Sequence, residues 1–341
     1  MTVVLEGSDP RELFSHLLLY GAAALCEHAG LEDVTLSWTH GMSPRPVLGA
    51  AGLDEQRLAE LVQLHGRSHS EGSWLALGQP AEPARGLLSP RVKPPTDRQE
   101  WLALQQARQA ALDHLTAGGQ RLDLRLLAAL GEPASWRQRR GDPVPDEGAS
   151  RLDMQPRNQG SEIIGNRLRP LAAVMARRSP EQMASGLLGQ TVLDDLGRSK
   201  SDSRGAVNLR PLGPTDSAQA WVALWGLTQT SLAQQVDGPS RTASHLPRGP
   251  HGVLAPRAGS FVVPVWQGDW RPARLRAVLR SAPLHRVGQA AVEGVDPPGE
   301  AVVWLTRRRV MSLITFPVAT KGSASAPERR ALGGVLHRLG G

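Results

Sequence analysis

Helical and extended patterns alternate in the N-terminal part of the chain. Residues 9–12 (Asp-Pro-Arg-Glu) are typical of a helix start, and Gly30 is typical of a helix end, with leucines recurring on one face between them. Residues 34–38 then alternate as a strand does, residues 54–65 have the spacing of a second amphipathic helix, and residues 73–77 indicate another strand. Such a mixture of short strands and helices favours an α+β fold.

Stretches rich in proline, glycine and polar residues divide the chain. Residues 78–95 are typical of a linker and residues 131–160 of a polar loop. Between them, residues 96–117 and 122–130 are predicted helices, the first capped by Thr96. We therefore predict three ranges: an N-terminal α/β region over residues 1–95, a helical segment with a basic loop over residues 96–160, and a C-terminal α+β region over residues 161–341.

The C-terminal region repeats the mixture of patterns. Helices are predicted over residues 162–178, 180–188, 216–227, 270–281 and 326–339. Strands are predicted over residues 260–266, 301–305 and 310–316, the last two forming a hairpin with Arg307, Arg308 and Arg309 at its turn. The expected fold class is α+β, with mixed helices and short antiparallel sheets in two loosely separated regions.

Positive charge is in excess. The formal net charge is +7, and all but three of the 39 basic residues are arginines. Codon usage in a GC-rich genome accounts for part of the preference for arginine over lysine, because Ala, Gly, Pro and Leu are abundant too, but it does not account for the net charge. A basic surface attracts polyanions, so the charge favours a nucleic-acid partner.

The cysteine count and the apolar runs bear on where the protein works. Cys26 is the single cysteine, which excludes an intramolecular disulfide and a cysteine metal cluster. The first ten residues lack the basic flank and apolar run of a signal peptide, and residues 13–25 are too short and too polar to span a bilayer. We expect a cytoplasmic protein with no membrane partner.

Motifs for enzymatic chemistry are weak. The sequence has no dinucleotide-binding glycine motif, no phosphate-binding lysine loop and no nucleophile elbow. His65 and His69 have the spacing of a helical metal pair, but a third ligand is not evident. Asp194, Asp195 and Lys200 resemble a nuclease metal core only loosely, since the aspartates follow a helical pattern. We therefore expect a protein that is not an enzyme and holds no cofactor and no metal.

Arginines gather in four clusters with few acidic neighbours. Guanidinium groups bind phosphate through paired hydrogen bonds and stay charged, so at least one cluster is expected to contact a nucleic-acid backbone. Aromatic residues are only 4%, which favours duplex backbone contact over stacking on single-stranded bases. The clusters are Arg137/Arg139/Arg140, Arg198/Lys200/Arg204/Arg210, Arg271/Arg274/Arg276/Arg280 and Arg307/Arg308/Arg309.

Three stretches carry a family resemblance. Residues 7–38, residues 208–226 (NLRPLGPTDSAQAWVALWG) and residues 260–279 (SFVVPVWQGDWRPARLRAVL) resemble segments of large-subunit-type proteins of type I CRISPR interference complexes, of the type I-U (or I-G) group. This resemblance implies a DNA-contacting subunit without nuclease activity, which reads the motif flanking the target. The implied partners are double-stranded DNA target, guide RNA, backbone subunits of the complex and a helicase-nuclease recruited on target binding.

Polar residues beside the basic loops are candidates for reading bases. Asn158 and Gln159 lie near Arg157, and Asn208 lies near Arg210. Asparagine and glutamine side chains pair with adenine edges in the major groove. Two alternatives remain open from the residues alone: a metal-dependent nuclease that uses Asp194 or Asp195, and a structural adaptor whose basic face binds an acidic protein.

Overall fold

The computed structural model describes residues 1–80, 82–89, 95, 97–130, 137–139, 142–144, 162–198, 208–211, 213–230, 244–247, 259–322 and 327–339. Helices and small antiparallel sheets make up these residues, so the predicted α+β class is confirmed. Within them, no helix is both long enough and apolar enough to cross a bilayer.

The strands pair antiparallel in three sheets within the described residues. Their bounds are β1 (Thr2–Val4), β2 (Thr35–Trp38), β3 (Pro46–Gly49), β4 (Arg137–Arg139), β5 (Asp142–Val144), β6 (His245–Pro247), β7 (Gly259–Trp266), β8 (Val310–Gly322), β9 (Pro327–Ala331) and β10 (Val335–Arg338). The small sheet has the order β1-β3-β2, and β4 pairs with β5. The large sheet has the order β10-β8-β7-β6, with β9 also paired to β8. β8 is thus long enough to pair with both β10 and β9 along one edge.

Several helices begin at a polar cap. Asp54, Asp97 and Asp216 accept backbone N–H groups at three helix starts, and Ser179 with Gln182 forms a capping box. The helices are α1 (Leu13–His28), α2 (Glu55–Ser68), α3 (Arg98–Ala117), α4 (Arg121–Leu130), α5 (Arg169–Arg177), α6 (Pro180–Leu187), α7 (Ser217–Trp225), α8 (Pro272–Leu279), α9 (Ala282–Glu293) and α10 (Gly299–Thr306), with short helical turns η1 (Trp74–Ala76), η3 (Ile164–Leu168) and η4 (Gly226–Gln229).

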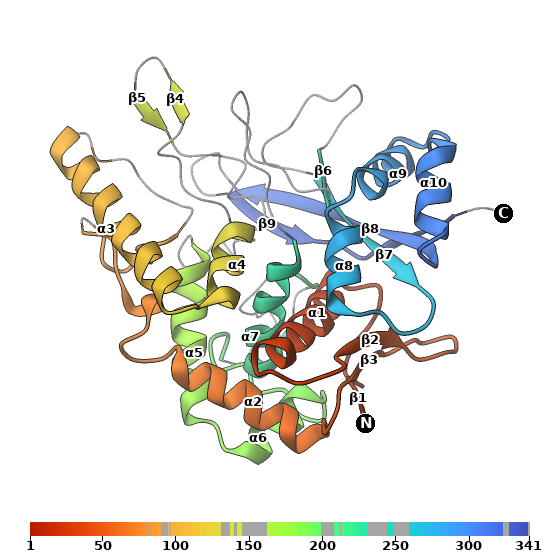
Figure 1. The fold of residues 1–341 in the computed structure, drawn as a ribbon, viewed down its shortest axis with the longest axis horizontal. Helices are drawn as coiled ribbons and strands as arrows, with labels where there is room; N and C mark the ends of the chain where they lie inside the picture. Colours follow the sequence, from red (N-terminus) through yellow and green to blue (C-terminus); the bar gives the residue numbers. More distant parts are fainter. Residues whose placement is uncertain are drawn as a thin grey trace.

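Helix α1 runs through the middle of the molecule, between α7 and the large sheet (Figure 1). It is apolar on nearly all sides, from Leu13 to Cys26, as expected of a fully buried helix. α2, α5 and α6 pack together on one side of it, and α9 and α10 lie against the large sheet. The helix therefore joins the N-terminal half of the chain to the C-terminal half.

One hydrophobic core contains side chains from all three predicted ranges. Leu19 on α1, Leu126 on α4 and Trp221 on α7 are fully buried members of it. Backbone hydrogen bonds in both directions between Leu36 and Trp270 also tie the small sheet to the start of α8. The boundaries predicted at residues 95 and 160 therefore do not separate independent cores.

Several predicted elements are corrected. Residues 301–305 are helical in α10, so the predicted hairpin does not exist, and Arg307–Arg309 follow a helix instead of joining two strands. The closing helix predicted over residues 326–339 is replaced by β9 and β10 in the described part of this range, because the long β8 offers them a pairing edge. Residues 73–77 hold the turn η1, and β1 and β3 were not predicted. Short apolar runs do not show whether hydrophobic residues recur with the spacing of a helix or of a strand, which explains why helices and strands were confused here.

Candidate nucleic-acid interface

Helix α8 presents its arginines because its apolar face is used for packing. Pro272 opens the helix, and Leu275, Val278 and Leu279 are buried. The hydrogen bonds between Trp270 and Leu36 fix the start of the helix against the small sheet. Arg274 and Arg276 lie on the part of the helix that is not buried, and Arg271 and Arg280 flank it as its N-cap and C-cap.

Two guanidinium groups, one from α8 and one from α4, meet at one carboxylate. Arg276 binds Glu27 through two bonds, Nη1 to Oε2 at 2.7 Å and Nη2 to Oε1 at 3.2 Å. Arg125 of α4 lies 3.7 Å from the same Oε2, and its Nη1 is buried without a hydrogen-bond partner. The pKa of Arg280 is lowered, first by partial desolvation and then by the positive charges of Arg276 and Arg125. The cluster therefore holds more positive than negative charge, and an anion would relieve the repulsion.

Aromatic rings lie beside two further arginines, Arg274 of α8 and Arg308 after α10. The Arg274 guanidinium lies 5.0 Å from the Trp270 ring centre, and its Nη2 donates to the Arg308 carbonyl at 2.8 Å. The Arg308 guanidinium lies 3.5 Å from the Trp304 ring centre and donates to the Trp304 carbonyl. These contacts hold the cations without neutralising them.

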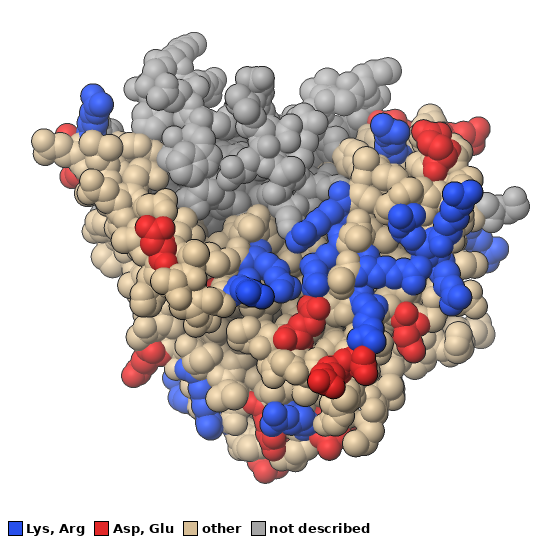
Figure 2. Space-filling model, in the orientation of Figure 1, with Lys and Arg blue, Asp and Glu red and all other residues tan. Residues whose placement is uncertain are grey.

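We call the combined surface the arginine face. In the described part of the chain, its ion pairs go only to Glu27 and, from Arg271, to Asp33 at 2.6 Å. Figure 2 shows the blue side chains gathered over and beside α8, with few red ones among them. The face consists of Arg125, Arg271, Arg274, Arg276, Arg280, Arg307, Arg308 and Arg309.

Arg307, Arg308 and Arg309 complete the C-terminal end of α10. Arg307 is the C-cap and is exposed, whereas Arg308 is half-buried against Trp304. Arg309 has a φ of 61°, a left-handed conformation that reverses the chain into β8. Its carbonyl accepts a hydrogen bond from Gln267 N. The structure thus brings this predicted cluster to the loop before α8, although through a helix end and not a hairpin turn.

Other predicted site residues lie elsewhere. Arg137 and Arg139 are on β4, and Arg198 is exposed after α6. Arg210 is half-buried, 3.1 Å from Glu12 and over the Phe14 ring, so it belongs to the packing of α1. Five further candidates lie outside the described residues: Arg140, Asn158, Gln159, Lys200 and Arg204.

Asn208 does not fit the predicted role in base reading. Its side chain is buried, and its Nδ2 donates to the Arg329 carbonyl at 2.9 Å. Its φ of 42° is in the left-handed region, which asparagine tolerates better than most residues. The prediction for Asn208 is therefore corrected: the residue joins the loop before α7 to β9 and cannot reach a DNA base.

Sequence reasoning missed Arg125 and Glu27 as parts of this surface. Arg125 is the only basic residue inside α4 after its first position, which is a weak signal by itself. Glu27 lies at the end of a buried helix, where a half-buried carboxylate needs a partner. The meeting of α1, α4 and α8 depends on the tertiary fold, so neither residue could be assigned from its local pattern.

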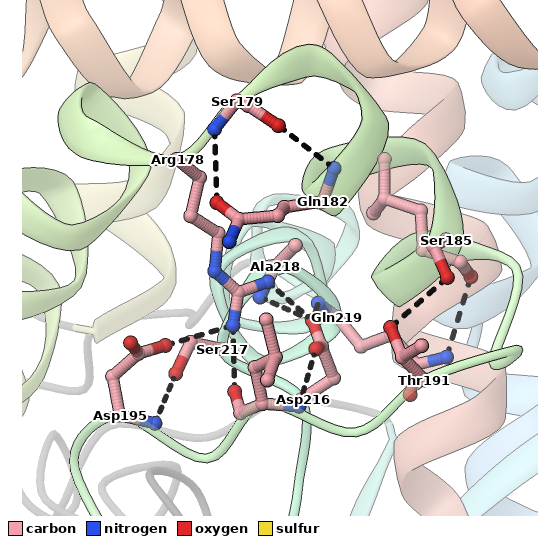
Figure 3. A network of polar contacts seen from close by, with 12 residues as sticks. Arg178, Ser179, Gln182, Ser185, Thr191, Asp195, Asp216, Ser217, Ala218 and Gln219 are labelled. Atoms are coloured by element: carbon pink, nitrogen blue, oxygen red, sulfur yellow. Dashed lines mark hydrogen bonds and ion pairs between the residues drawn. The ribbon is translucent and has the colours of Figure 1, made fainter.

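Asp195, one of the acidic residues considered for a nuclease core, takes part in a structural network around Arg178 (Figure 3). Arg178 is buried and reaches Asp216 Oδ1 at 2.9 Å and Asp195 Oδ2 at 2.7 Å. Asp194 is buried too, and its Oδ1 accepts from Gly197 N at 2.8 Å. The carboxylates thus hold the segment between α6 and α7 in place.

The histidine pair lies in the interior. His69 Nε2 is 2.6 Å from Asp123 Oδ1, and Trp74 Nε1 donates to the same oxygen at 2.7 Å. His65 is stacked against His69, and the pKa of His65 is lowered, mainly by desolvation and further by the neighbouring charge of His69. Within the described residues, no group of three His, Cys, Asp or Glu side chains is placed to hold a metal ion.

Comparison with known proteins adds no family to this description. No protein-family model matches the sequence, and no curated protein matches it.

Proposed function

We propose that this chain is a non-catalytic subunit that contacts duplex DNA through the arginine face. The observation that carries the proposal is the meeting of Arg125 and Arg276 at the single carboxylate of Glu27, with Arg280 close enough to both arginines to be affected by their charge. Arg276 is held in place by its bidentate pair, while Arg280 forms no ion pair among the described residues. A phosphate would bind there with little further ordering of side chains, because the fold already orients the guanidinium groups.

The rings near the arginine face favour backbone contact over base stacking. Trp270 is buried, and the ring of Trp304 is covered on one side by Arg308. Stacking on single-stranded bases needs exposed aromatic faces, whereas phosphate contact needs only cations along a surface. Phosphate contact also gives affinity without sequence specificity, so a separate element would have to read the flanking motif.

The role within a complex rests on the resemblance of residues 7–38, 208–226 and 260–279 to type I CRISPR large subunits. We propose that the chain works in the cytoplasm in an RNA-guided interference complex with a guide RNA, backbone subunits and a recruited helicase-nuclease. Co-purification of the chain with the products of neighbouring genes, followed by sequencing of bound RNA, tests this part. Recovery of the same protein partners after nuclease treatment, with no RNA bound, would favour the structural adaptor.

A double variant tests the DNA contact. Arg125→Ser with Arg280→Ser removes two cations from the arginine face and leaves the Arg276–Glu27 pair intact. We expect a loss of duplex affinity of at least about tenfold, or ~1.4 kcal/mol. The slope of the logarithm of affinity against the logarithm of salt concentration should also become shallower by about 1.8, because two phosphate contacts are lost. The matched control is Arg57→Ser with Arg67→Ser, which removes the same charge from exposed positions of α2.

Two outcomes would overturn the proposal. Equal losses in the test and control variants would mean that net charge alone attracts DNA. Magnesium-dependent cleavage of DNA by the purified chain would favour the nuclease alternative, particularly if Asp195→Ala abolished it without loss of folding.

A further inference from the structure

A large cavity lies beside the edge of the large sheet, and none of the arginines of the arginine face lines it. Its volume is 1250 Å³, and its walls come from the start of α1, the loop between β2 and β3, the loop after β7, and strands β8 and β10. Trp38, Val265, Met311, Ile314 and Leu336 are among the apolar side chains that line it. Met311 and Leu336 are 54% and 56% exposed, so the fold leaves part of this apolar surface uncovered.

Strand β10 forms one border of the cavity and is the end strand of its sheet. Leu339 N bonds to Met311 O, and β10 pairs with β8 in the register Leu336 to Ile314. Antiparallel pairing alternates bonded and non-bonded positions, so the N–H and C=O groups of Leu336 and Arg338 point away from β8. Within the described residues, one backbone hydrogen bond is made on the outer side of β10: Gly334 N, just before the strand, donates to Arg11 O. The rest of the edge is open to pairing with another strand.

The charges around the cavity decide among possible occupants. Arg11 is paired with Asp9 at 3.1 Å, and the Arg45 guanidinium donates to the Ser8 carbonyl. The carboxylate of Asp269 lines the cavity as well. The lining thus has little unbalanced positive charge, in contrast to the arginine face, and does not suit a phosphate backbone.

Pairing with a second copy of the chain is disfavoured by the backbone around Arg11. If two β10 strands paired about a two-fold axis at Leu336, Arg338 of one copy would lie opposite Gly334 of the other. Gly334 N already donates to Arg11 O, so the outer edge is occupied at that position in both copies. A short peptide that pairs only with Leu336 and Arg338 does not meet this obstacle, and an acidic side chain on it has an exposed cation, Arg338, as its partner.

We propose that the cavity and the edge of β10 bind an extended peptide segment of a protein partner. The segment adds a strand beside β10 through the backbone groups of Leu336 and Arg338. Every second side chain of the segment is apolar and enters the cavity, against Met311 and Leu336. An aspartate or glutamate follows the apolar stretch and pairs with Arg338, which is exposed and forms no ion pair among the described residues.

The probe is a displayed library of random short peptides, selected on the full chain. Enriched peptides are expected to alternate apolar with other residues and to carry an acidic residue beyond them. Synthetic copies should bind at least about tenfold more weakly to Leu336→Lys, because the change places a charge in the apolar cavity. Methylation of alternate peptide nitrogens should weaken binding similarly, since it removes the donors that strand pairing requires. The matched control is Val303→Lys, an exposed valine of α10 outside the cavity.

A charge reversal makes the test specific. Arg338→Glu should shift the preference from peptides ending in aspartate to otherwise identical peptides ending in lysine. Peptides that bind Leu336→Lys as well as the wild type, or a library without enrichment, would overturn the proposal. Dimers that Leu336→Lys abolishes would favour a second copy instead, and competition by a single-stranded oligonucleotide would favour nucleic acid. Duplex binding by the arginine face is measured separately with the Arg125 and Arg280 variants, so the two proposals can fail independently.

Discussion

Arg178 Nη1 lies 2.9 Å from Asp216 Oδ1, and both side chains are buried. The same carboxylate accepts the N–H groups of Ala218 and Gln219 at the start of α7, and its other oxygen accepts Leu193 N. One aspartate thus neutralises a buried cation, caps a helix and holds a loop (Figure 3). Such a group is more important to the fold than an exposed ion pair of the same length.

Substitution of the two carboxylates around Arg178 should have unequal effects. Asp216→Asn removes the buried charge partner of Arg178 and leaves only the half-exposed Asp195, so we expect a loss of about 3–5 kcal/mol in the free energy of unfolding. Asp195 is 40% exposed, so Asp195→Asn should cost no more than about 1 kcal/mol. Urea denaturation of both variants measures the difference, and a similar small loss in both would show that Arg178 is compensated by water.

The aspartates that suggested a nuclease are expected to be dispensable for DNA binding. Asp194→Ala together with Asp195→Ala should weaken folding, because Asp194 accepts a hydrogen bond from Gly197 N and Asp195 forms an ion pair with Arg178. The affinity of the folded fraction for duplex DNA should remain unchanged, since neither residue belongs to the arginine face. Binding is measured at a temperature where circular dichroism shows the variant to be folded. Loss of cleavage by an assembled complex, with normal binding, would favour the nuclease alternative.

Single changes should separate the roles of the arginines after α10. Arg308→Ser removes a guanidinium that lies over Trp304, and we expect a loss of roughly 1 kcal/mol in stability. Arg307→Ser should leave stability unchanged, because the side chain is exposed and has no ion pair among the described residues. Both variants should bind duplex DNA more weakly at low salt. Unchanged affinity in both would restrict the DNA contact to the arginines around Glu27.

The sequence predicted most helices because their start signals are local. The cap at Asp216, the capping box at Ser179 and the apolar periodicity of α2 can all be recognised within a few residues. The exchange of helix and strand after residue 300 has the opposite origin. β9 and β10 exist because β8 pairs with both of them, and this pairing overrides a pattern that resembles a helix.

The candidate site was predictable only in part, for a similar reason. Arg271 and Arg274 were predicted from their cluster, and the structure places Arg274 beside Arg308 and pairs Arg271 with Asp33. Asn208 was predicted as a base reader from its position near Arg210, but tertiary packing buries it. Arg125 joins the surface through helix packing that no local pattern encodes. The charge clusters therefore predicted a positively charged surface better than they predicted which residues form it.

Buried histidines should make the protein less stable in mild acid. Burial lowers the pKa of His16 to about 4, so the folded protein leaves His16 neutral where an unfolded chain, with a pKa near 6.5, would protonate it. The unfolded state then binds more protons as pH falls, and stability is lost between about pH 6.5 and 4. At pH 5, this difference in the pKa of His16 lowers the free energy of unfolding by about 2 kcal/mol. The lowered pKa of His65 acts in the same direction.

The test compares wild-type and His16→Gln proteins by chemical denaturation at neutral pH and at pH 5. Glutamine keeps a donor that can reach the Pro10 carbonyl, which His16 Nε2 now contacts at 2.8 Å, but it does not titrate. We expect the variant to be less stable at neutral pH and to lose about 2 kcal/mol less than the wild type on acidification. An equal loss in both proteins would mean that His16 is protonated in the folded state.

The crossing of α1 and α7 depends on two glycines that leave no room for a side chain. A methyl group on Gly21 would overlap the backbone of Val222, and one on Gly226 would overlap the backbone of Leu17. Backbone atoms inside packed helices cannot move aside as a flexible side chain can. We therefore expect Gly21→Ala to lower the free energy of unfolding by about 3 kcal/mol or more, although alanine is the better helix former.

The matched control is Gly299→Ala at the start of α10, where an added methyl group meets open space. This change should leave stability unchanged or raise it by up to about 1 kcal/mol. Thermal and urea denaturation of the two variants measure the contrast, and a mild effect of Gly21→Ala would mean that α1 and α7 lie farther apart than the structure places them.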